Sequence, residues 1–363
     1  MKHLLLLGGG HAHVQVLHAF AQEPLPGVRV TLVSPFPRQM YSGMVPGLVA
    51  GHYSVDECVI PLAPLAQRAQ AEFIEGCAVR LDAGARQVTL ANAQVMSYDV
   101  LSVDTGPVMD RDAIPGAREH GLFVRPIEHF ARMWELLLAS AEQGGMSVAV
   151  IGAGAAGVEL ALAIQYRLGD RARISLVTGG PPALAEYPVP VQDRARSELR
   201  RKGVTVIEDS CAQITAQHVH LGGATRLQCD APVLAIGSSA PDWLAGSGLA
   251  LDQHGFIATA LTLQSTSHAQ VFAAGDVASS VALQRPKSGV FAVRAGPPLA
   301  LNLRRYLGAG GALHEHLPKL GSLNLLACGR RSAIVAWGSW SAQGALAWYW
   351  KDRIDRRFVA KYR

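Results

Sequence analysis

Two glycine-rich segments of the same type place backbone groups where they could bind phosphate. Residues 8–13, Gly-Gly-Gly-His-Ala-His, follow the apolar run 4–7, and residues 152–157, Gly-Ala-Gly-Ala-Ala-Gly, follow the apolar run 148–151. Each segment leads into a helical pattern, and a tight turn that opens a helix in this way is typical of a pyrophosphate-binding site. Two such turns in one chain therefore predict two dinucleotide-binding sites.

The second segment has all three glycines that such a turn requires. Gly152 permits the turn, Gly154 lets the dinucleotide approach the backbone, and Gly157 lets the helix pack closely on its strand. Thr178 follows the next expected strand, where an acidic residue usually holds a ribose hydroxyl, and Gly237 ends a later strand. Since neither an acid that would exclude a 2′-phosphate nor a neighbouring arginine that would bind one stands there, NADH is only slightly favoured over NADPH.

The first segment departs from this pattern at its third position. Gly8 and Gly10 are present, but His13 replaces the last glycine, so it must either push the helix outward or fill a gap between its neighbours. We expect His13 and His11 to be packed side chains rather than metal ligands, because residues two apart on a helix point to different faces. His11 is also a candidate cofactor contact, and Ser34 stands where the ribose-binding acid would follow the second strand.

A third segment indicates which dinucleotide the first turn binds. Residues 266–276 predict a buried strand that ends at Asp276, whose carboxylate would hold the ribityl chain of FAD at the edge of the sheet. The alternative role for Asp276 is the N-cap of a helix. The first site is therefore expected to hold FAD and the second a nicotinamide cofactor.

Two charged residues are candidate catalytic residues. Lys287 precedes Ser288, Gly289 and Val290, where a helix start aimed at the flavin would favour the reduced ring by up to about 2 kcal/mol, or roughly 40 mV. The alternative for Lys287 is a solvated lysine. Glu159 comes just after the last glycine of the second segment. We interpret it as a polar contact of the nicotinamide or a proton relay, or else as an acid that the helix dipole favours.

The order of the expected elements indicates the fold class. Strands are expected at 2–7, 28–33, 98–106, 147–151, 173–177, 204–207 and 231–237, with helices at 12–22, 157–168 and 193–202. Strands that alternate with helices over short links predict an α/β protein with two doubly wound, Rossmann-like units. We expect the strand before Asp276 to return to the first sheet, so the nicotinamide unit is an insertion within the flavin unit.

These expectations divide the chain into four parts. The flavin domain takes residues 1–111 and 246–320, the NAD(P) domain takes 112–245, and a C-terminal interface or anchor region takes 321–363. At 363 residues the chain exceeds what a single core usually fills, which agrees with more than one domain.

Composition narrows the classes of function. The net charge is only +5 and the basic residues are spread out, which excludes a nucleic-acid-binding protein. The five cysteines form neither a Cys-x-x-Cys pair nor a Cys/His cluster, so reduced thiols are favoured over a redox disulfide, and no metal site is expected. No apolar run approaches the ~18 residues of a membrane-spanning helix, and the first apolar run is too short for a signal peptide, so we expect a cytoplasmic protein.

The last helical pattern has an apolar stripe and a basic face. The stripe consists of Leu346, Trp350, Ile354, Phe358 and Tyr362. It either packs on the domain, which is favoured, or lies on an anionic membrane surface. Whether the chain pairs with a second copy is left open.

Four stretches of the sequence also carry a family resemblance, at residues 8–14, 41–47, 285–296 and 351–358. With them the chain resembles the FAD-dependent pyridine-nucleotide oxidoreductases close to type II NADH dehydrogenases. Within that group it is most similar to the flavoprotein domain fused in front of selenide, water dikinase. The resemblance implies non-covalent FAD, hydride transfer from NAD(P)H to the flavin, and a quinone-like electron acceptor.

The resemblance also implies roles for individual residues. The FAD contacts would be Gly8, Gly10, Ser34, Gly106 and Asp276, with 287–290 beneath the isoalloxazine and 41–47 bordering it, while Gly152, Gly154, Gly157 and Glu159 would form the nicotinamide site. Thr105, next to Gly106, is a further candidate cofactor contact. We expect a free-standing version without a kinase-like domain, and the C-terminal region is shorter than the membrane-anchoring part of type II dehydrogenases. A flavin-bearing regulatory module therefore stays an alternative, as does a sulfide- or selenium-oxidising relative that would depend on Cys328.

Overall fold

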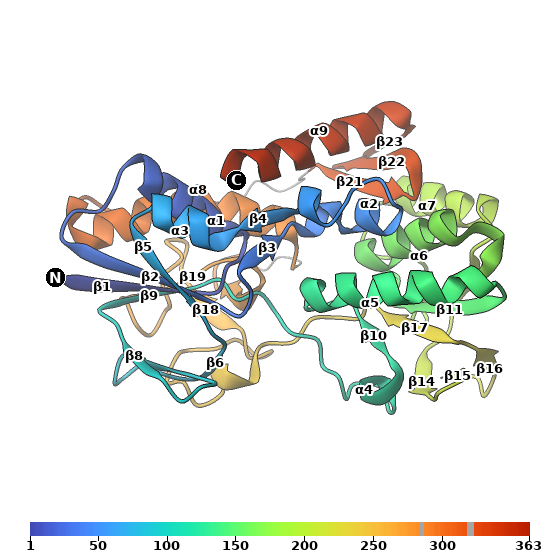
Figure 1. Ribbon diagram of the computed structural model, residues 1–363, viewed down its shortest axis with the longest axis horizontal. Helices are drawn as coiled ribbons and strands as arrows, with labels where there is room; N and C mark the ends of the chain where they lie inside the picture. The colour runs from blue at the N-terminus through green and yellow to red at the C-terminus, as the bar shows by residue number, and fades with distance from the viewer. Residues whose placement is uncertain (284–286, 318–322) are drawn as a thin grey trace.

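The computed structural model describes residues 1–283, 287–317 and 323–363. Figure 1 shows two α/β units side by side along the longest axis of the molecule, with a C-terminal sheet and helix running along one side of both. We call them the first unit, the second unit and the C-terminal region. The α/β class with two Rossmann-like units that the sequence predicts is confirmed.

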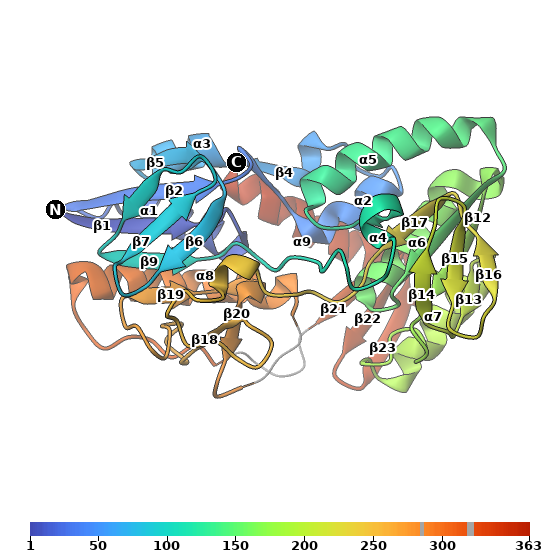
Figure 2. The same ribbon diagram turned by 90° about the horizontal axis from the view of Figure 1, so that it is seen from below.

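The first unit is built on a parallel sheet with strand order β19-β9-β1-β2-β5. The strands are β1 (Lys2–Leu7), β2 (Val28–Ser34), β5 (Ala71–Glu75), β9 (Val100–Val103) and β19 (Val271–Ala273). Leu4 and Leu6 pack among the helices on one face, and Leu5 and Leu7 pack on the other face against a small antiparallel sheet. The helices are α1 (His11–Gln22), α3 (Leu62–Arg68) and α8 (Gly289–Arg304), and the small sheet consists of β6 (Ala78–Asp82), β7 (Gln87–Leu90) and β8 (Val95–Ser97) (Figure 2).

The second unit repeats this arrangement. Its parallel sheet has the order β10-β17-β11-β12-β13. The strands are β10 (Leu122–Phe123), β11 (Met146–Ile151), β12 (Ala172–Val177), β13 (Thr205–Ile207) and β17 (Ala231–Leu234). Helices α5 (Ile127–Ser140), α6 (Ala155–Leu168) and α7 (Val189–Arg201) cover one face, and β14 (Cys211–Ile214), β15 (His218–Leu221) and β16 (Arg226–Gln228) form the sheet on the other. The short helix α4 (Ala117–His120) precedes β10.

The strand register shows how the two units are connected. Leu101 of β9 pairs with Val271 of β19, and every strand of the second parallel sheet lies between these two strands in the chain. The second unit is thus inserted into the first, as expected from the sequence. The boundaries at 111/112 and 245/246 remain predictions, and the one at 320/321 lies outside the described residues.

Some elements begin or end away from their expected positions. Helix α7 starts at Val189 instead of 193, because Pro190 lies in the first turn, where a missing N–H costs no helical hydrogen bond. Strand β17 ends at Leu234, and β19 gives way to a 3-10 turn at Gly275–Val277. The smaller elements include α2 (Val45–Val49), β3 (Arg38–Met40), β4 (Val59–Pro61), β18 (Ile257–Thr259), β20 (Ala278–Ser280) and the 3-10 turns Ser42–Met44 and Asp56–Cys58.

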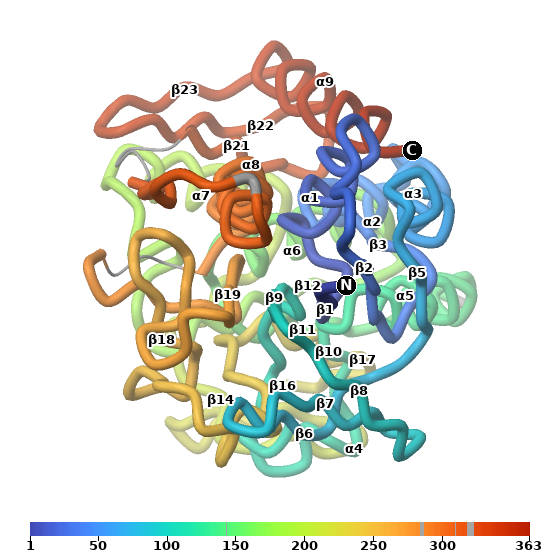
Figure 3. The backbone as a smooth tube through the Cα atoms, turned by 90° about the vertical axis from the view of Figure 1, so that its left-hand side faces the viewer, coloured from blue at the N-terminus to red at the C-terminus, as the bar shows by residue number. Residues whose placement is uncertain are grey.

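The C-terminal region joins the two units. It consists of β21 (Asn324–Cys328), β22 (Arg330–Trp337), β23 (Trp340–Gly344) and α9 (Ala345–Tyr362). The sheet packs against α6 and α7 of the second unit, while α9 packs against α1 and β4 of the first (Figure 3). Within the described ranges, no helix combines the length and hydrophobicity that crossing a bilayer requires.

Helix α9 does not bury the stripe that the sequence predicts. Only Phe358 and Tyr362 of that stripe pack, whereas Leu346, Trp350 and Ile354 are 86%, 43% and 42% exposed. The buried face instead carries Ala347, Trp348, Asp355, Val359 and Tyr362. The apolar pattern alone was misleading because Asp355 takes a buried position, where it is paired with Lys351.

Candidate functional site

The first glycine turn has the close contacts expected of a dinucleotide cradle. Gly8 has φ +97°, and a Cβ there would lie 2.5 Å from the carbonyl oxygen of Asp104. A Cβ on Gly10 would lie 2.4 Å from Asp104 Oδ1. Larger residues are therefore excluded at both positions, and α1 starts directly after them with its N-terminus at the turn. These residues fit a bound pyrophosphate.

His13 fills the position of the missing third glycine. Its side chain is fully buried, Nδ1 donates to the Gly8 carbonyl oxygen at 2.6 Å, and Nε2 lies 2.8 Å from Ser102 Oγ. Burial lowers the pKa of His13 to about 4, so the ring is neutral at neutral pH. His13 is thus the packed residue that the sequence analysis favours.

Asp104 is a residue of this site that the sequence analysis missed. Its carboxylate Oδ2 accepts the backbone N–H groups of Ala12 and His13 at 2.8 and 2.9 Å, so it occupies two donors at the start of α1. Burial raises the pKa of Asp104 to about 8, although these two N–H groups oppose the shift. The only signal in the sequence was that Asp104 is an acidic residue at the end of an apolar strand, just before Thr105 and Gly106.

Ser34 and His11 lie beside the same turn. A Cβ on Gly9 would approach Ser34 Oγ to 3.1 Å, and Ser34 is buried. The His11 ring lies 5.3 Å from the ring of Tyr41, and its Nε2 is 3.3 Å from Ser42 Oγ. Residues 41–47 therefore border the start of α1, where the family resemblance puts them next to the flavin.

Asp276 is brought to the start of α1 by the turn after β19. A Cβ on the preceding Gly275 would lie 2.7 Å from Asp104 Oδ1. Asp276 is only 8% exposed, and burial raises its pKa, while Arg125, at 3.6 Å between Nη2 and Oδ2, opposes the shift. Asp276 is not an N-cap, because it lies inside the 3-10 turn Gly275–Val277, whose N-cap is Ala274. The N-cap of α8 is Ser288, whose Oγ accepts the N–H of Val290 and whose own N–H donates to Asp276. The N-cap alternative is thus wrong.

Lys287 is not a solvated side chain. Its Nζ donates to the carbonyl oxygen of Ala278 at 2.6 Å and lies 3.7 Å from the centre of the Phe256 ring. Ser288 follows Lys287, and α8 begins with Gly289 and Val290. The charge of Lys287 and the N–H of Ser288 both act on Asp276. Arg285 and Pro286, which belong to the same predicted helix start, lie outside the described residues.

The second glycine turn matches its expected pattern. Gly152 has φ +103°, and its Cβ would lie 2.4 Å from the carbonyl oxygen of Ala235. A Cβ on Gly157 would lie 1.8 Å from the carbonyl oxygen of Gly152, whereas the positions of Gly154 and Gly237 are open. Helix and strand are thus in contact at the third glycine, and space is left at the second.

Thr178 directly follows β12, at the edge of the sheet where the second turn lies. Its Oγ1 is buried and has no hydrogen-bond partner among the described residues. Burying a hydroxyl without a hydrogen-bond partner costs free energy of folding, and a hydroxyl of a bound ligand would supply the missing hydrogen bond. These residues fit the ribose and pyrophosphate of a dinucleotide.

Glu159 lies where α6 meets the C-terminal region. Its Oε1 accepts the N–H of Ala327 in β21 at 2.7 Å. Burial raises the pKa of Glu159 to about 7, and the charge of Lys351 opposes this shift. A carboxyl with this pKa can both hold and release a proton near neutral pH.

Lys351 and Asp355 form a buried ion pair that the sequence analysis missed. Their side chains are 11% and 7% exposed, and Nζ donates to Asp355 Oδ2 and to the Gly43 carbonyl oxygen, each at 2.6 Å. Tyr41 hydrogen-bonds to Asp355, and burial is the main cause of its raised pKa. The i, i+4 spacing of a lysine and an aspartate on the last helix was the available signal.

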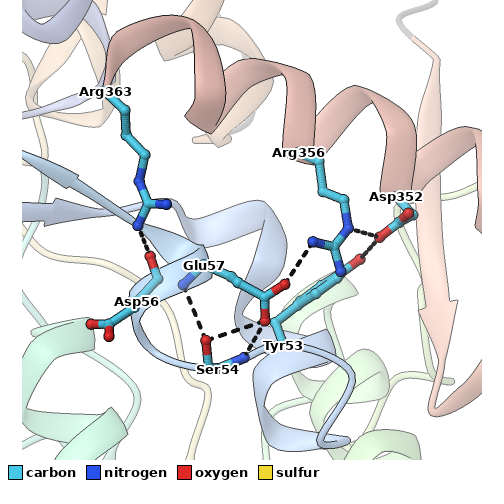
Figure 4. A network of polar contacts seen from close by, with 7 residues as sticks. All are labelled: Tyr53, Ser54, Asp56, Glu57, Asp352, Arg356 and Arg363. Atoms are coloured by element: carbon cyan, nitrogen blue, oxygen red, sulfur yellow. Dashed lines mark hydrogen bonds and ion pairs between the residues drawn. The ribbon is translucent and has the colours of Figure 1, made fainter.

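A second polar cluster fixes α9 to the first unit (Figure 4). Tyr53 donates to Asp352 Oδ1 at 2.7 Å, and Arg356 bridges Asp352 and Glu57 at 2.9 and 2.7 Å. Arg363 donates to the carbonyl oxygens of Asp56 and Val59. Some basic residues of α9 therefore form intramolecular contacts with the first unit.

The cysteines show no redox arrangement. All five are free, and Cys328 is 1% exposed with a pKa raised by burial, so it carries no reactive thiolate. Across the described ranges, no group of three or more His, Cys, Asp or Glu side chains could hold a metal ion.

Comparison with known proteins finds one matching protein family and several relatives of this chain. The protein family described as "Pyridine nucleotide-disulphide oxidoreductase" matches residues 2–296. Oxidoreductase ptaL of Pestalotiopsis fici is 27% identical over 301 residues, which cover 78% of this chain and 79% of that protein. Demethylphylloquinone reductase NdbB of Synechocystis sp. is 25% identical over 286 residues, or 75% of this chain and 71% of that protein.

Solved structures show the same fold. The sulfide:quinone oxidoreductase of Aquifex aeolicus is similar with a TM-score of 0.83 and 18% identity, over 100% of this chain and 92% of that one. The NDH2 of Plasmodium falciparum in complex with NADH gives a TM-score of 0.84 at 13% identity, over 99% and 97% of the two chains.

Proposed function

Because the chain belongs to the pyridine nucleotide-disulphide oxidoreductase family, we propose that it is an NAD(P)H:quinone oxidoreductase. It is an FAD-dependent enzyme with a second site for NAD(P)H. Bound FAD supplies the capacity to take a hydride and to pass electrons on. The observation that carries the proposal is the pair of cradles, at Gly8–Gly10 and Gly152–Gly157, on two linked parallel sheets with Asp276 beside the first.

The first cradle is assigned to FAD. Gly8, Gly10 and His11 would hold the pyrophosphate at the start of α1, and Asp276 the ribityl chain. The remaining contacts in this assignment are Ser34, Thr105, Gly106, Ser288, Gly289 and Val290. Lys287, held near Asp276, would favour negative charge on the reduced ring.

The second cradle is assigned to the nicotinamide cofactor. Gly152, Gly154 and Gly157 would hold its pyrophosphate, and Gly237 leaves open space at the same edge. Thr178 would bind a ribose hydroxyl through its partnerless Oγ1. NADH is favoured over NADPH, since no basic residue follows Thr178 directly.

Glu159 is assigned a role in proton transfer. A quinone that accepts two electrons also takes up two protons, so the site needs a group that supplies protons near neutral pH. Glu159 meets this requirement through its pKa of about 7. Lys351 of α9 would stabilise the ionised form of Glu159, and Asp355 would hold the side chain of Lys351 in position.

Steady-state assays with different acceptors test the proposed function. The purified protein should oxidise NADH with a soluble quinone and with ferricyanide. A Glu159→Gln variant should lose turnover with the quinone by about 10- to 1,000-fold but keep the ferricyanide rate, because ferricyanide takes no proton. Equal loss with both acceptors would contradict the assigned role of Glu159. No turnover with any quinone would contradict the proposed function.

We further propose that an aromatic patch at the C-terminal region contacts a membrane surface. The patch consists of Trp337, Trp340, Leu346, Tyr349, Trp350 and Ile354, each at least 42% exposed. Arg353 and Arg357 are exposed on the same helix, and aromatic side chains beside cations suit the interface of an anionic bilayer. The quinone pool would then lie close to Lys351 and Glu159.

Vesicle flotation tests this contact. The wild-type protein should float with vesicles that contain anionic lipid, and a Leu346→Ser/Trp350→Ser variant should stay in solution. Leu136→Ser, which alters a 58% exposed residue on α5, is the matched control and should float. A stable dimer in solution that buries the patch would contradict the membrane contact.

A further inference from the structure

Strand β13 leaves one edge of the second parallel sheet unpaired. It is the last strand in the order β10-β17-β11-β12-β13, and among the described residues it pairs only with β12. The N–H of Thr178 donates to the carbonyl oxygen of Ile207 at 2.9 Å, so the backbone groups of Ile207 face β12. Because the backbone groups of successive strand residues point to alternate sides, the N–H and C=O of Val206 point away from the sheet.

A cavity of about 430 Å³ lies along this unpaired edge. It is lined by β13 itself, by the last turns of α7 and by the residues on either side of the strand. The lining residues include Leu199, Arg200, Val204, Val206 and Glu208. The space beside the backbone of Val206 is therefore open, as the approach of a further strand requires.

The two ends of this edge carry opposite charges. Arg200 lies beside the start of β13, because the N–H groups of Gly203 and Val204 donate to the carbonyl oxygens of Arg200 and Leu199 at 3.1 and 3.0 Å. Glu208 directly follows the last residue of the strand. Both side chains are exposed, and neither has an ion-pair partner in the part of the chain that the structure describes. Such an edge attracts a second copy of itself that runs in the opposite direction, because the positive end of one then meets the negative end of the other.

A two-fold axis beside Val206 satisfies the backbone and the charges together. Two β13 strands related by this axis are antiparallel, and Val206 would exchange both N–H···O=C bonds with Val206 of the second copy. Counting outward from this pair places Glu208 opposite Val204 of the second copy, beside Arg200 of that copy. We propose that the unpaired edge of β13 is a docking surface for a second copy of this chain, held by two backbone hydrogen bonds and two Glu208–Arg200 ion pairs.

Sedimentation velocity of the purified holoprotein over a range of concentrations tests the inference. The wild-type protein should form a dimer with a dissociation constant of about 1–100 µM, as expected of a small interface. Glu208→Arg and Arg200→Glu each replace both ion pairs by like charges, so each should raise the dissociation constant by about 10- to 100-fold. The double variant Glu208→Arg/Arg200→Glu restores opposite charges, and its dissociation constant should return to within about threefold of the wild-type value.

The matched control is Arg132→Glu, which makes the same change of charge at an exposed residue of α5. Helix α5 packs on β10, at the opposite edge of the sheet, so this variant should dimerise as the wild type does. Wild-type protein that stays monomeric up to about 1 mM would overturn the inference. A dimer that persists in both single variants, or that the double variant does not restore, would also overturn it.

Hydrogen exchange on the wild-type protein tests the strand pairing without any substitution, and it carries the test if the variants do not fold. The Val206 N–H should exchange at least about 10-fold more slowly well above the dissociation constant than well below it. The amides of β15, in the other sheet of the same unit, are the internal reference and should exchange equally at both concentrations. Equal exchange of Val206 at both concentrations would overturn the inference.

The outcome is separable from that of the proposed function, which this inference goes beyond. Neither measurement involves NADH or a quinone. A monomeric protein that oxidises NADH overturns only the inference about β13, and a dimer that oxidises no NADH overturns only the proposed function.

Discussion

Alanine at Gly157 and at Gly154 should separate the structural role of the second turn from its binding role. A Cβ on Gly157 would lie 1.8 Å from the carbonyl oxygen of Gly152, so α6 must move away from β11 by about 1 Å. Overpacking of this kind costs about 1–3 kcal/mol. Gly157→Ala should therefore lower the free energy of unfolding by that amount and weaken NADH binding as well.

Gly154→Ala meets a different environment. Among the described residues, and apart from its own chain neighbours and helix backbone, no atom would lie within 4 Å of a Cβ at this position, and its φ of −68° suits any residue. Its free energy of unfolding should stay within about 0.5 kcal/mol of the wild-type value. The added methyl group would nevertheless enter the space that the nicotinamide dinucleotide needs, so NADH binding should weaken by about 10-fold or more.

Three measurements on each variant separate the two roles. Urea unfolding gives the stability, and titration with NADH during anaerobic flavin reduction gives the affinity, while flavin content reports on the first site. Both variants should retain FAD. Wild-type NADH affinity in Gly154→Ala would refute the assignment of this turn to the nicotinamide cofactor. Unchanged stability in Gly157→Ala would refute the close packing of helix and strand.

Three other substitutions test the C-terminal junction. Burial raises the pKa of Glu159 to about 7 from 4.5, so the ionisation of this residue destabilises the folded protein as the pH rises through that window. The melting temperature of Glu159→Gln should therefore exceed that of the wild type by more at about pH 8 than at about pH 5. Equal differences at the two pH values would contradict the buried, raised pKa of Glu159. Lys351→Met leaves Asp355 buried without its cation and should cost about 3–5 kcal/mol in urea unfolding; a loss below about 1 kcal/mol would show that the pair is not buried. Cys328→Ala should keep its NADH oxidation rate within about twofold, because a buried thiol has no part in the chemistry; collapse of the rate would favour the cysteine-dependent alternative.

The local signals in the sequence were sufficient for the fold. The apolar runs before Gly8 and Gly152 became the central strands β1 and β11, and the strand before Asp276 returned to the first sheet. These features depend on short-range apolar patterns, which are visible in the sequence, and on the handedness of strand–helix–strand units, which is a general rule of protein folds. His13 could also be predicted as a packed residue, because a missing glycine leaves a gap that a side chain must fill.

Arg125 and Asp355 were missed for different reasons, since the contact of Arg125 joins residues far apart in the sequence and that of Asp355 lies within one helix. Arg125 and Asp276 are brought together only by the packing of one unit on the other, and no local pattern marks either as a partner. Asp355 was hidden because a buried charge breaks the apolar periodicity that located α9. The exposed positions of Leu346 and Trp350 follow from the same cause, since the helix turns its polar pair inward.

Anaerobic mixing of the purified protein with NADH tests the central claim most directly. The account predicts a yellow protein whose flavin absorption bleaches within seconds and returns when a quinone is added. NADPH should bleach it more slowly. A colourless protein that does not take up FAD, or a flavin that neither nucleotide reduces, would contradict the account.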